Sequence, residues 1–468
     1  MPRIPRLWLL AAAAIALLVP AGAHGAPVAD PPGDARGPLD LAEALLEQRD
    51  VRMSLRLTTS GAWTHADLAA GGRALCVTLA PGEPAIASGR LCVASDGDRP
   101  ALDYTALNAD GTKRGEKRRL AARVTHPSPS VLQASFLPVA AGLSVGPLAW
   151  SVQSSWADTA DCAQVCVDLL PDTGGVPTQI GLLGVPRCFG AASRDPSKTC
   201  ENPELDRTVL PRPSKPKVLL DPYCDRQTHP GLLSTCAFGA AAGDAESTFA
   251  LIGDSHASSM KTPLEVVTLG KRWRGVSIIR ATCPVTQARP VLRTRQRAQQ
   301  CVQWNRQVLG WLADHDEVDT VFLSAYAGAK VYRPGGKDTS VYETARIGYR
   351  DAIRRLLRVV PRVVVIRDIP TAAGGHLDCV STSLKNGQGP GTGCSERRGR
   401  ALRRDPLVAG ARAAGSSRVR VIDLSRQFCD NRRCFAVVGG ALVHHDKTHM
   451  TTAFGATLGP YIMRALDG

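Results

Sequence analysis

From residue 248 onward, short strand-like runs alternate with segments of helical pattern. The strand-like runs are TFALI (248–252), VSIIR (276–280), VDTVFLS (318–324), RVVVIRD (362–368) and VRVID (419–423). Helices are expected near 257–270, 298–313, 340–358 and 451–466. This alternation predicts a mostly parallel sheet covered by helices on both faces. In such sheets, binding and catalytic residues gather at the carboxyl ends of the strands.

The preceding half of the chain has a different pattern. Eight short strand-like runs between about residues 50 and 172 are separated by turn sequences such as PGEP, SDGDRP, NADG and HPSPS. Such spacing predicts an antiparallel β-sandwich. A chain of 468 residues exceeds one core of ordinary size. We therefore predict a multidomain protein with a β-sandwich at 27–172, a cysteine-containing connector at 173–247 and an α/β domain at 248–468.

The N-terminus indicates export. Arg3 and Arg6 precede LWLLAAAAIALLV, an apolar run of 13 residues, and small residues follow in AGAHGAP. This pattern predicts a secretory signal peptide over residues 1–26, because the run is short for a membrane span. An uncleaved membrane anchor is the alternative. The expected location is secreted or in the cell envelope.

The cysteines agree with an oxidising compartment. All 14 follow the leader, an even number, and no two CxxC pairs lie at the spacing of a zinc ribbon. Disulfides are therefore favoured over metal binding. Sequence leaves the connectivity open. Pairing each cysteine with its neighbour would give Cys76–Cys92, Cys162–Cys166, Cys188–Cys200, Cys224–Cys236, Cys283–Cys301, Cys379–Cys394 and Cys429–Cys434.

The formal charge is +15, and it falls by two, to +13, if Arg3 and Arg6 leave with the signal peptide. The basic clusters KRWR (271–274), RTRQR (293–297) and ERRGRALRRD (396–405) are scattered, and no nucleic-acid-binding motif accompanies them. We therefore expect no nucleic-acid partner. Affinity for anionic envelope polymers is the secondary interpretation of this charge.

The run TFALI ends at Gly-Asp-Ser-His, where a strand passes into a helix. Asp254 or Ser255 could simply cap that helix. Alternatively, Ser255 is a nucleophile beside free backbone N–H groups. A serine hydroxyl needs a base, and the base needs a group that orients its ring. Asp446 and His449 in HHDKTHMTTAFG (444–455) have the spacing for both roles.

Two other interpretations of this C-terminal segment remain open. Asp446 or Thr448 could cap the last helix, with His449 in its first turn. His445 and His449 are four residues apart and could bind a metal ion, but the glutamate of the zinc protease motif is missing. We favour the triad of Ser255, His449 and Asp446, with no metal and no cofactor.

GDSH after a strand, joined to D-x-x-H near the end of the α/β region, resembles the SGNH (GDSL-like) hydrolase family. The closest likeness is to the SGNH domain fused to bacterial membrane O-acyltransferases, and it covers about 248–468. Further similar stretches are ATCP (281–284), CVQWN (301–305), FLSAY (322–326), CDNRRC (429–434) and DKTHMT (446–451). The resemblance implies a three-layer α/β/α domain and a serine acyl-enzyme.

The resemblance also implies roles for single residues. Ser255 would be the nucleophile and supply a backbone N–H to the oxyanion hole, His449 would be the general base and acid, and Asp446 would orient it. Asp254 is expected to brace the turn and His256 to shape the pocket, together with Ser324 and Tyr326. The family usually carries an oxyanion glycine after the second strand and an oxyanion asparagine after the third. Here ATCP follows VSIIR and contains no glycine, and SAYAG follows VDTVFL and contains no asparagine.

The predicted function is a secreted serine esterase or O-acyltransferase acting on acyl esters, acetyl esters above all, of cell-envelope or extracellular carbohydrate. No stretch after the leader approaches ~18 consecutive apolar residues, so an acyl group for transfer would come from a separate membrane acyltransferase. The alternative is a non-catalytic protein that binds envelope polymers through a degenerate SGNH domain.

Overall fold

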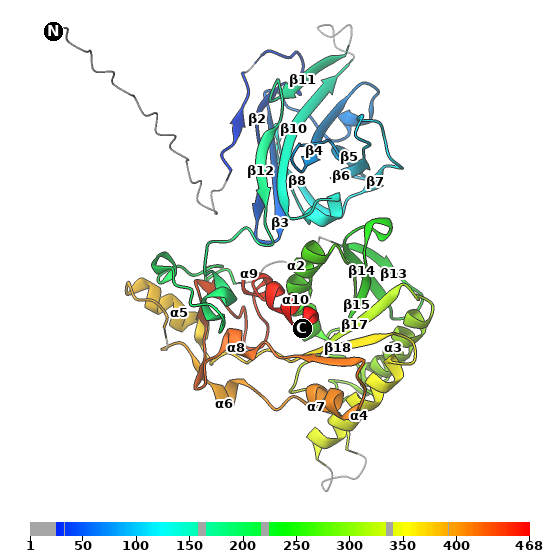
Figure 1. The fold of residues 1–468 in the computed structure, drawn as a ribbon, viewed down its shortest axis with the longest axis vertical. Helices are drawn as coiled ribbons and strands as arrows, with labels where there is room; N and C mark the ends of the chain where they lie inside the picture. The colour runs from blue at the N-terminus through cyan, green and yellow to red at the C-terminus, as the bar shows by residue number, and fades with distance from the viewer. Residues whose placement is uncertain (1–24, 32, 158–164, 217–223, 334–339, 392) are drawn as a thin grey trace, which may run out of the picture.

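The computed structural model describes residues 25–31, 33–157, 165–216, 224–333, 340–391 and 393–468. Figure 1 shows an N-terminal region rich in sheet and a C-terminal region in which helices surround a sheet. The predicted signal peptide lies almost entirely outside these residues. In the described parts of the chain, no helix is both long enough and apolar enough to cross a membrane.

The N-terminal region contains two antiparallel sheets. The first has the order β1-β2-β3-β9-β8, with β1 (Val28–Ala29), β2 (Leu41–Arg49), β3 (Arg52–Thr59), β8 (Ala122–Ser128) and β9 (Val131–Phe136). The second has the order β11-β10-β4-β5-β6-β7, and β12 also pairs with β10. Its strands are β4 (Ala74–Pro81), β5 (Gly89–Asp96), β6 (Arg99–Ala106), β7 (Arg118–Arg119), β10 (Gly146–Trp156), β11 (Cys166–Leu170) and β12 (Val176–Ile180).

The two N-terminal sheets share a hydrophobic core. Along β10 the burial alternates residue by residue, as expected of a strand with one face turned inward. Leu55 and Leu57 of β3 belong to the same buried cluster as Val77 and Leu79 of β4. The short 3₁₀ turns η1 (Asp67–Ala69) and η2 (Pro138–Ala141) lie in the connections of this region.

The C-terminal sheet has the order β13-β14-β16-β15-β17-β18-β20. Five strands are parallel, and β14 pairs antiparallel with β16, as β13 does with β14. The sheet is therefore mixed, with its antiparallel strands at one edge. The strands are β13 (Asp225–Thr228), β14 (Ser234–Gly239), β15 (Thr248–Gly253), β16 (Arg274–Ile279), β17 (Val318–Ser324), β18 (Arg362–Ile366) and β20 (Val419–Ile422).

Helices follow most of these strands along the chain. They are α1 (Ser255–Ser259), α2 (Lys261–Lys271), α3 (Arg295–Ala313), α4 (Val341–Leu356), α5 (His376–Lys385), α6 (Arg398–Ala401), α7 (Pro406–Ala413), α8 (Ser425–Phe428), α9 (Thr452–Ala456) and α10 (Gly459–Asp467). Two small ladders complete the domain, formed by β19 (Glu396–Arg397) with β21 (Arg433–Cys434) and by β22 (Val437–Val438) with β23 (Ala441–Leu442).

Strand β15 lies in the middle of the sheet and is buried along its whole length. Phe249 and Leu251 pack in the cluster that contains residues of α2 and α10. Ala250 and Ile252 pack in the cluster that contains residues of α3, α4 and α7. Helices therefore contact both sides of this strand, and the residues after Gly253 emerge at the carboxyl end of the parallel strands.

Regular structure extends into the region predicted as a connector. Strand β12 pairs with β10 and lies beyond the predicted boundary at residue 172. Strands β13 and β14 lie before the predicted boundary at 247 and extend the C-terminal sheet. The segment between β12 and β13 contains the short turns η3 (Gly190–Arg194) and η4 (Pro203–Leu205), and η5 (Ala242–Asp244) precedes β15.

Six of the neighbouring cysteine pairs form disulfides in the structure. They are Cys76–Cys92, Cys188–Cys200, Cys224–Cys236, Cys283–Cys301, Cys379–Cys394 and Cys429–Cys434. The predicted Cys162–Cys166 pair cannot be placed, because Cys162 lies outside the described residues. Disulfides on this scale fit an oxidising compartment.

A buried ion pair joins the two regions. Arg52 of β3 lies 2.7 Å from Glu265 of α2, and Lys261 lies 2.8 Å from the other carboxylate oxygen of Glu265. Removing one partner of a buried ion pair is costly, because it leaves a charge without compensation. This contact therefore fixes helix α2 against the N-terminal sheet.

Candidate active site

The turn after β15 is built for close approach of two backbones. A Cβ on Gly253 would lie 2.2 Å from the carbonyl oxygen of Ser324 on the neighbouring strand and 2.6 Å from the Cβ of Ala257. Only glycine fits there. Asp254 follows as the N-cap of α1, and its carboxylate accepts a hydrogen bond from the backbone N–H of His256 at 2.9 Å. Ser255 is thereby placed as the first residue of α1.

The structure brings Ser255, His449 and Asp446 into one hydrogen-bonded chain. Ser255 Oγ lies 2.9 Å from His449 Nε2. His449 Nδ1 lies 2.9 Å from Asp446 Oδ2 and 3.1 Å from Oδ1. This arrangement allows the imidazole to take a proton from the hydroxyl while the carboxylate holds the ring and favours its charged form.

Asp446 is held ionised by its surroundings. Burial opposes ionisation, but the backbone N–H groups of Thr448 and His449, each donating at 2.8 Å, outweigh it together with the His449 side chain. The pKa of Asp446 is lowered to about 2. The carboxylate is therefore charged throughout the pH range in which a histidine titrates.

The capping interpretation of this segment is wrong. The N-cap of α9 is Thr451, whose hydroxyl accepts a hydrogen bond from the N–H of Phe454 at 3.2 Å. His449 lies before this cap, in a tight turn closed by the backbone hydrogen bond from His445 to His449 at 3.0 Å. Asp446 and His449 thus belong to the turn and leave the helix end to another residue.

The C-terminal turn also contains a possible set of metal ligands. His445, Asp446 and His449 offer ligand atoms that lie within 4.8 Å of one another. Both ring nitrogens of His449 are already engaged, one by Ser255 and one by Asp446. A metal ion bound through His449 would therefore have to displace one of these two partners.

A second histidine–aspartate pair lies beside the first. His256 Nδ1 lies 2.6 Å from Asp368 Oδ1, and both side chains are buried. The ring of His256 packs between Tyr326 and His449, with centroid distances of 4.7 and 4.8 Å. Burial opposes a charge on His256, but the hydrogen bond and the charge of Asp368 prevail and raise its pKa.

Asp368 was not among the site residues predicted from the sequence. It stands just beyond the carboxyl end of β18, and its second oxygen accepts the N–H of Ala327 at 2.8 Å. Its own N–H donates to Asp405 at 3.0 Å, and burial followed by the charge of Asp368 raises the pKa of Asp405 to about 6. An acidic residue directly after a buried parallel strand is a signal that could have indicated it.

The other residues expected near the pocket have different places. Asp254 braces the turn, because its second oxygen accepts the N–H of Tyr326 at 3.0 Å. Tyr326 lines the cavity beside Ser255, whereas Ser324 does not. The Ser324 hydroxyl is buried and has no hydrogen-bond partner among the residues that the structure describes.

A cavity of about 610 Å³ opens in front of Ser255 and His449. Residues of the loop after β16 form part of its wall, and this loop is closed by the Cys283–Cys301 disulfide. Basic side chains also line it, from that loop, from the start of α3 and from the loop after β17. These are Arg293, Arg297 and Lys330.

The wall also contains Thr282, whose backbone has the left-handed φ of 63°. Such a conformation is uncommon for a β-branched residue. Thr282 belongs to the ATCP segment, where the resemblance calls for a glycine. Asn305 points elsewhere, since its amide donates to the carbonyl oxygens of Pro284 at 3.2 Å and Cys301 at 3.0 Å.

Comparison with known proteins identifies one matching family model. The model described as the SGNH domain fused to AT3 domains matches residues 223–464. Among solved structures, the periplasmic domain of a lipopolysaccharide acetyltransferase from Salmonella ser. Paratyphi A is similar at 14% identity with a TM-score of 0.38. That match covers 48% of this chain and 85% of the other. No curated protein matches.

Proposed function

Because the chain belongs to the family of SGNH domains that are fused to AT3 domains, we propose that it is a serine esterase or O-acyltransferase. Its substrates would be acyl esters, acetyl esters above all, of cell-envelope or extracellular carbohydrate. Family membership supports an acyl esterase or acyltransferase kind of function. It also supports the predicted three-layer arrangement of the C-terminal domain.

The observation that carries the proposal is the 2.9 Å distance between Ser255 Oγ and His449 Nε2. His449 removes the proton as Ser255 Oγ attacks the ester carbonyl carbon. The same proton then passes to the departing alcohol oxygen, and the acyl group stays on Ser255. In the second half, water or a sugar hydroxyl attacks the acyl carbon and gives its proton to His449. The bond between the acyl group and Ser255 Oγ then breaks, and His449 returns the proton to Oγ.

The negative oxygen of each tetrahedral intermediate needs donors. Ser255 opens α1, so its backbone N–H has no acceptor within the helix. We propose it as one oxyanion donor and the backbone near Thr282 as the second, because Thr282 lines the same cavity. Asn305 is not proposed as an oxyanion donor, because its amide is bonded elsewhere.

The alternative of a binding protein without activity is less favoured, because the serine and the histidine lie within hydrogen-bond reach. Hydrolysis and transfer share the acyl-enzyme and differ only in the acceptor. For transfer, the acyl group would come from a separate membrane acyltransferase. Export by the predicted signal peptide would place the protein where such a partner and its glycans lie.

The test uses the full-length protein with a fluorophosphonate probe and a short-chain aryl ester. Wild type should label and turn over, and Ser255→Ala should do neither. Ser258→Ala is the matched control, since Ser258 lies on the same short helix. If wild type labels no better than Ser255→Ala, the nucleophile is wrong. Comparing an O-acetylated glycan with an acyl donor plus a glycan acceptor then separates hydrolase from transferase.

A further inference from the structure

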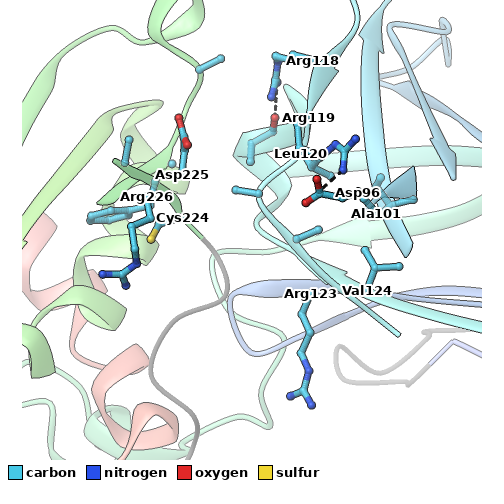
Figure 2. Close-up of a pocket in the computed structure, with 18 of the residues that line it drawn as sticks. Asp96, Ala101, Arg118, Arg119, Leu120, Arg123, Val124, Cys224, Asp225 and Arg226 are labelled. Carbon is cyan, nitrogen blue, oxygen red and sulfur yellow. Dashed lines mark hydrogen bonds and ion pairs between the residues drawn. The ribbon is translucent and has the colours of Figure 1, made fainter. Parts of the chain in front are cut away.

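A second and larger cavity lies where the N-terminal region meets the C-terminal sheet (Figure 2). Its volume is about 910 Å³, toward the upper end of the range of ligand-binding pockets. One wall comes from β6, β7 and β8, and the other from β13, β14 and the start of β16. It is therefore an interdomain cleft, built by two regions that fold from distant parts of the chain.

This cleft lies away from the candidate active site. Ser255 follows the carboxyl end of β15, whereas Arg274 in the cleft begins β16, which runs parallel to β15. The amino and carboxyl ends of parallel strands lie at opposite edges of the sheet. A ligand in the cleft would thus contact the protein at a place separate from the reacting ester.

The interdomain cleft is strongly basic. Six arginines line it against two aspartates, Asp96 and Asp225. The arginines are Arg99, Arg118, Arg119, Arg123, Arg226 and Arg274. Figure 2 shows Arg226 on the C-terminal wall and Arg118, Arg119 and Arg123 on the N-terminal wall, so both walls contribute arginines to the cleft.

The carboxylates nearby compensate only part of this charge. Arg119 lies 2.8 Å from Asp103 and 3.7 Å from Asp96. Arg123 and Arg226 are exposed, and neither forms an ion pair or a side-chain hydrogen bond with any residue that the structure describes. These two guanidinium groups are available to an external anion.

Two further guanidinium groups are already partly desolvated. Arg118 is half-buried, donates to the carbonyl oxygen of Ala140 and stacks over the ring of Tyr104 at 4.5 Å. Arg274 is half-buried and donates to the carbonyl oxygen of Ala240 at 3.4 Å. Burial lowers the pKa of both groups, and the charge of Arg274 adds to the effect on Arg118. A bound anion would offset this cost.

The cleft also offers backbone groups. Strands β7, β8 and β13 each form the edge of their own sheet. Edge strands carry N–H and C=O groups without a partner strand, which can bond to hydroxyl groups. Aromatic surface is scarce, since Phe238 of the lining is buried and His126 packs against Trp63 at 4.4 Å. Stacking of nucleic-acid bases is therefore not favoured.

From these observations we infer that the interdomain cleft binds an anionic segment of a carbohydrate polymer, with guanidinium groups on its carboxylates or phosphates and strand edges on its hydroxyls. This rests on the proposed function, because the polymer would be the one whose esters reach Ser255. The cleft would hold the chain while the distant serine acts on its acyl groups.

The test measures binding by the full-length Ser255→Ala protein, which holds the polymer without turnover. Polygalacturonate supplies carboxylates, a glycerol-phosphate teichoic acid supplies phosphates, and dextran is the neutral comparison. In that background, Arg123→Glu/Arg226→Glu is compared with Arg56→Glu/Arg355→Glu. The second pair changes the net charge equally at exposed arginines, one on β3 and one on α4, outside the cleft. Circular dichroism verifies that both variants are folded.

We expect calorimetry to detect binding of at least one anionic polymer and none of dextran. The cleft variant should bind at least ~10-fold more weakly, because charge-assisted hydrogen bonds are lost. The control variant should keep most of the affinity. Comparing the affinities for polygalacturonate and teichoic acid then shows whether the cleft prefers carboxylates or phosphates.

Three results would overturn the inference. They are equal affinity of the cleft variant and its parent, an equal loss in the control variant, and binding of double-stranded DNA as tight as that of the best glycan. Failure of the proposed function is read separately, from probe labelling of the wild type. Binding without labelling would leave the cleft standing and refute the esterase.

Discussion

The imidazole rings of His256 and His449 lie 4.8 Å apart, and each is bonded to its own aspartate. The pairing with Asp368 raises the pKa of His256 against the opposing effect of burial. His256 therefore stays positive to a higher pH than an ordinary histidine. Its charge opposes the arrival of a second positive charge on His449, which must be neutral to act as the proposed base.

We predict that His256→Gln moves the acid limb of the pH profile of kcat/KM to higher pH. The substitution removes the positive charge beside His449, so a proton binds there more readily and a higher pH is needed to remove it. His229→Gln is the control, because His229 bonds to Thr235 of β14, in the antiparallel part of the sheet. If kcat/KM falls by the same factor at every pH and the acid limb of the profile does not move, His256 acts only by packing.

Asp446→Asn should lower turnover by roughly 10²–10⁴. The amide can still accept the backbone N–H groups of Thr448 and His449, so the turn is kept. It cannot stabilise the imidazolium, and it presents a donor to His449 Nδ1.

Asp430→Asn is the matched control for Asp446→Asn. Asp430 accepts the backbone N–H groups of Arg432 and Arg433 at 2.7 and 2.6 Å in a similar turn. Steady-state assays on an acetyl ester compare the two. Wild-type turnover in Asp446→Asn would remove this residue from the proposed mechanism.

In His444→Gln, the free energy of unfolding should fall less steeply as the pH is lowered than it does in the wild type. Burial, opposed only in part by the carbonyl oxygen of Pro370, lowers the pKa of His444 to about 4. Between pH ~6.5 and about 4 the unfolded chain binds a proton there that the folded chain does not. Stability therefore falls as pH falls through this window, by about 3 kcal/mol from this group.

Denaturant unfolding at several pH values measures the difference between wild type and His444→Gln. Asp405, with its pKa raised to about 6, contributes the opposite trend, a loss of stability as pH rises toward 6, but it does so in both proteins. The difference should shrink as the pH is lowered. A constant difference across the window would mean that His444 is not held neutral.

Cys283→Ser/Cys301→Ser should lower both stability and activity. The disulfide closes a loop over a sequence separation of 18 residues, which corresponds to ~3 kcal/mol on the chain-entropy model. That loop carries Arg293, which lines the candidate active site. Cys76→Ser/Cys92→Ser removes a bridge of similar separation, 16 residues, in the N-terminal sheet. It should cost stability alone, and equal activity loss in both would contradict the positioning role of the loop.

Some elements were predictable because one local pattern dominated. The five parallel strands of the C-terminal sheet were expected, since each is a short β-rich run between turn or helix signals. The junction at Gly253 was expected as well, because a glycine and a capping aspartate follow a fully apolar run. Hydrogen-bond contact among Ser255, His449 and Asp446 agrees with the prediction, while their catalytic role remains our proposal.

Other elements depended on tertiary contacts that no local pattern reports. Strand β2 was not predicted, because LAEALLEQR consists of strong helix formers, and pairing with β1 and β3 overrides that propensity. The short α7 was also missed, although Asp405 caps it. The position of Asp368 after β18 was a local signal, but its contact with His256 depends on the fold.

Ser255 and His449 are separated by 194 positions along the chain. Under the proposed mechanism, a chain whose synthesis or export has stopped between these positions would have the nucleophile but not its base. The proposed catalytic pair would therefore form only after nearly the whole C-terminal domain has been synthesised and folded. If the proposed mechanism and the predicted export both hold, a partly exported chain would be unable to attack the esters that it meets on the way out.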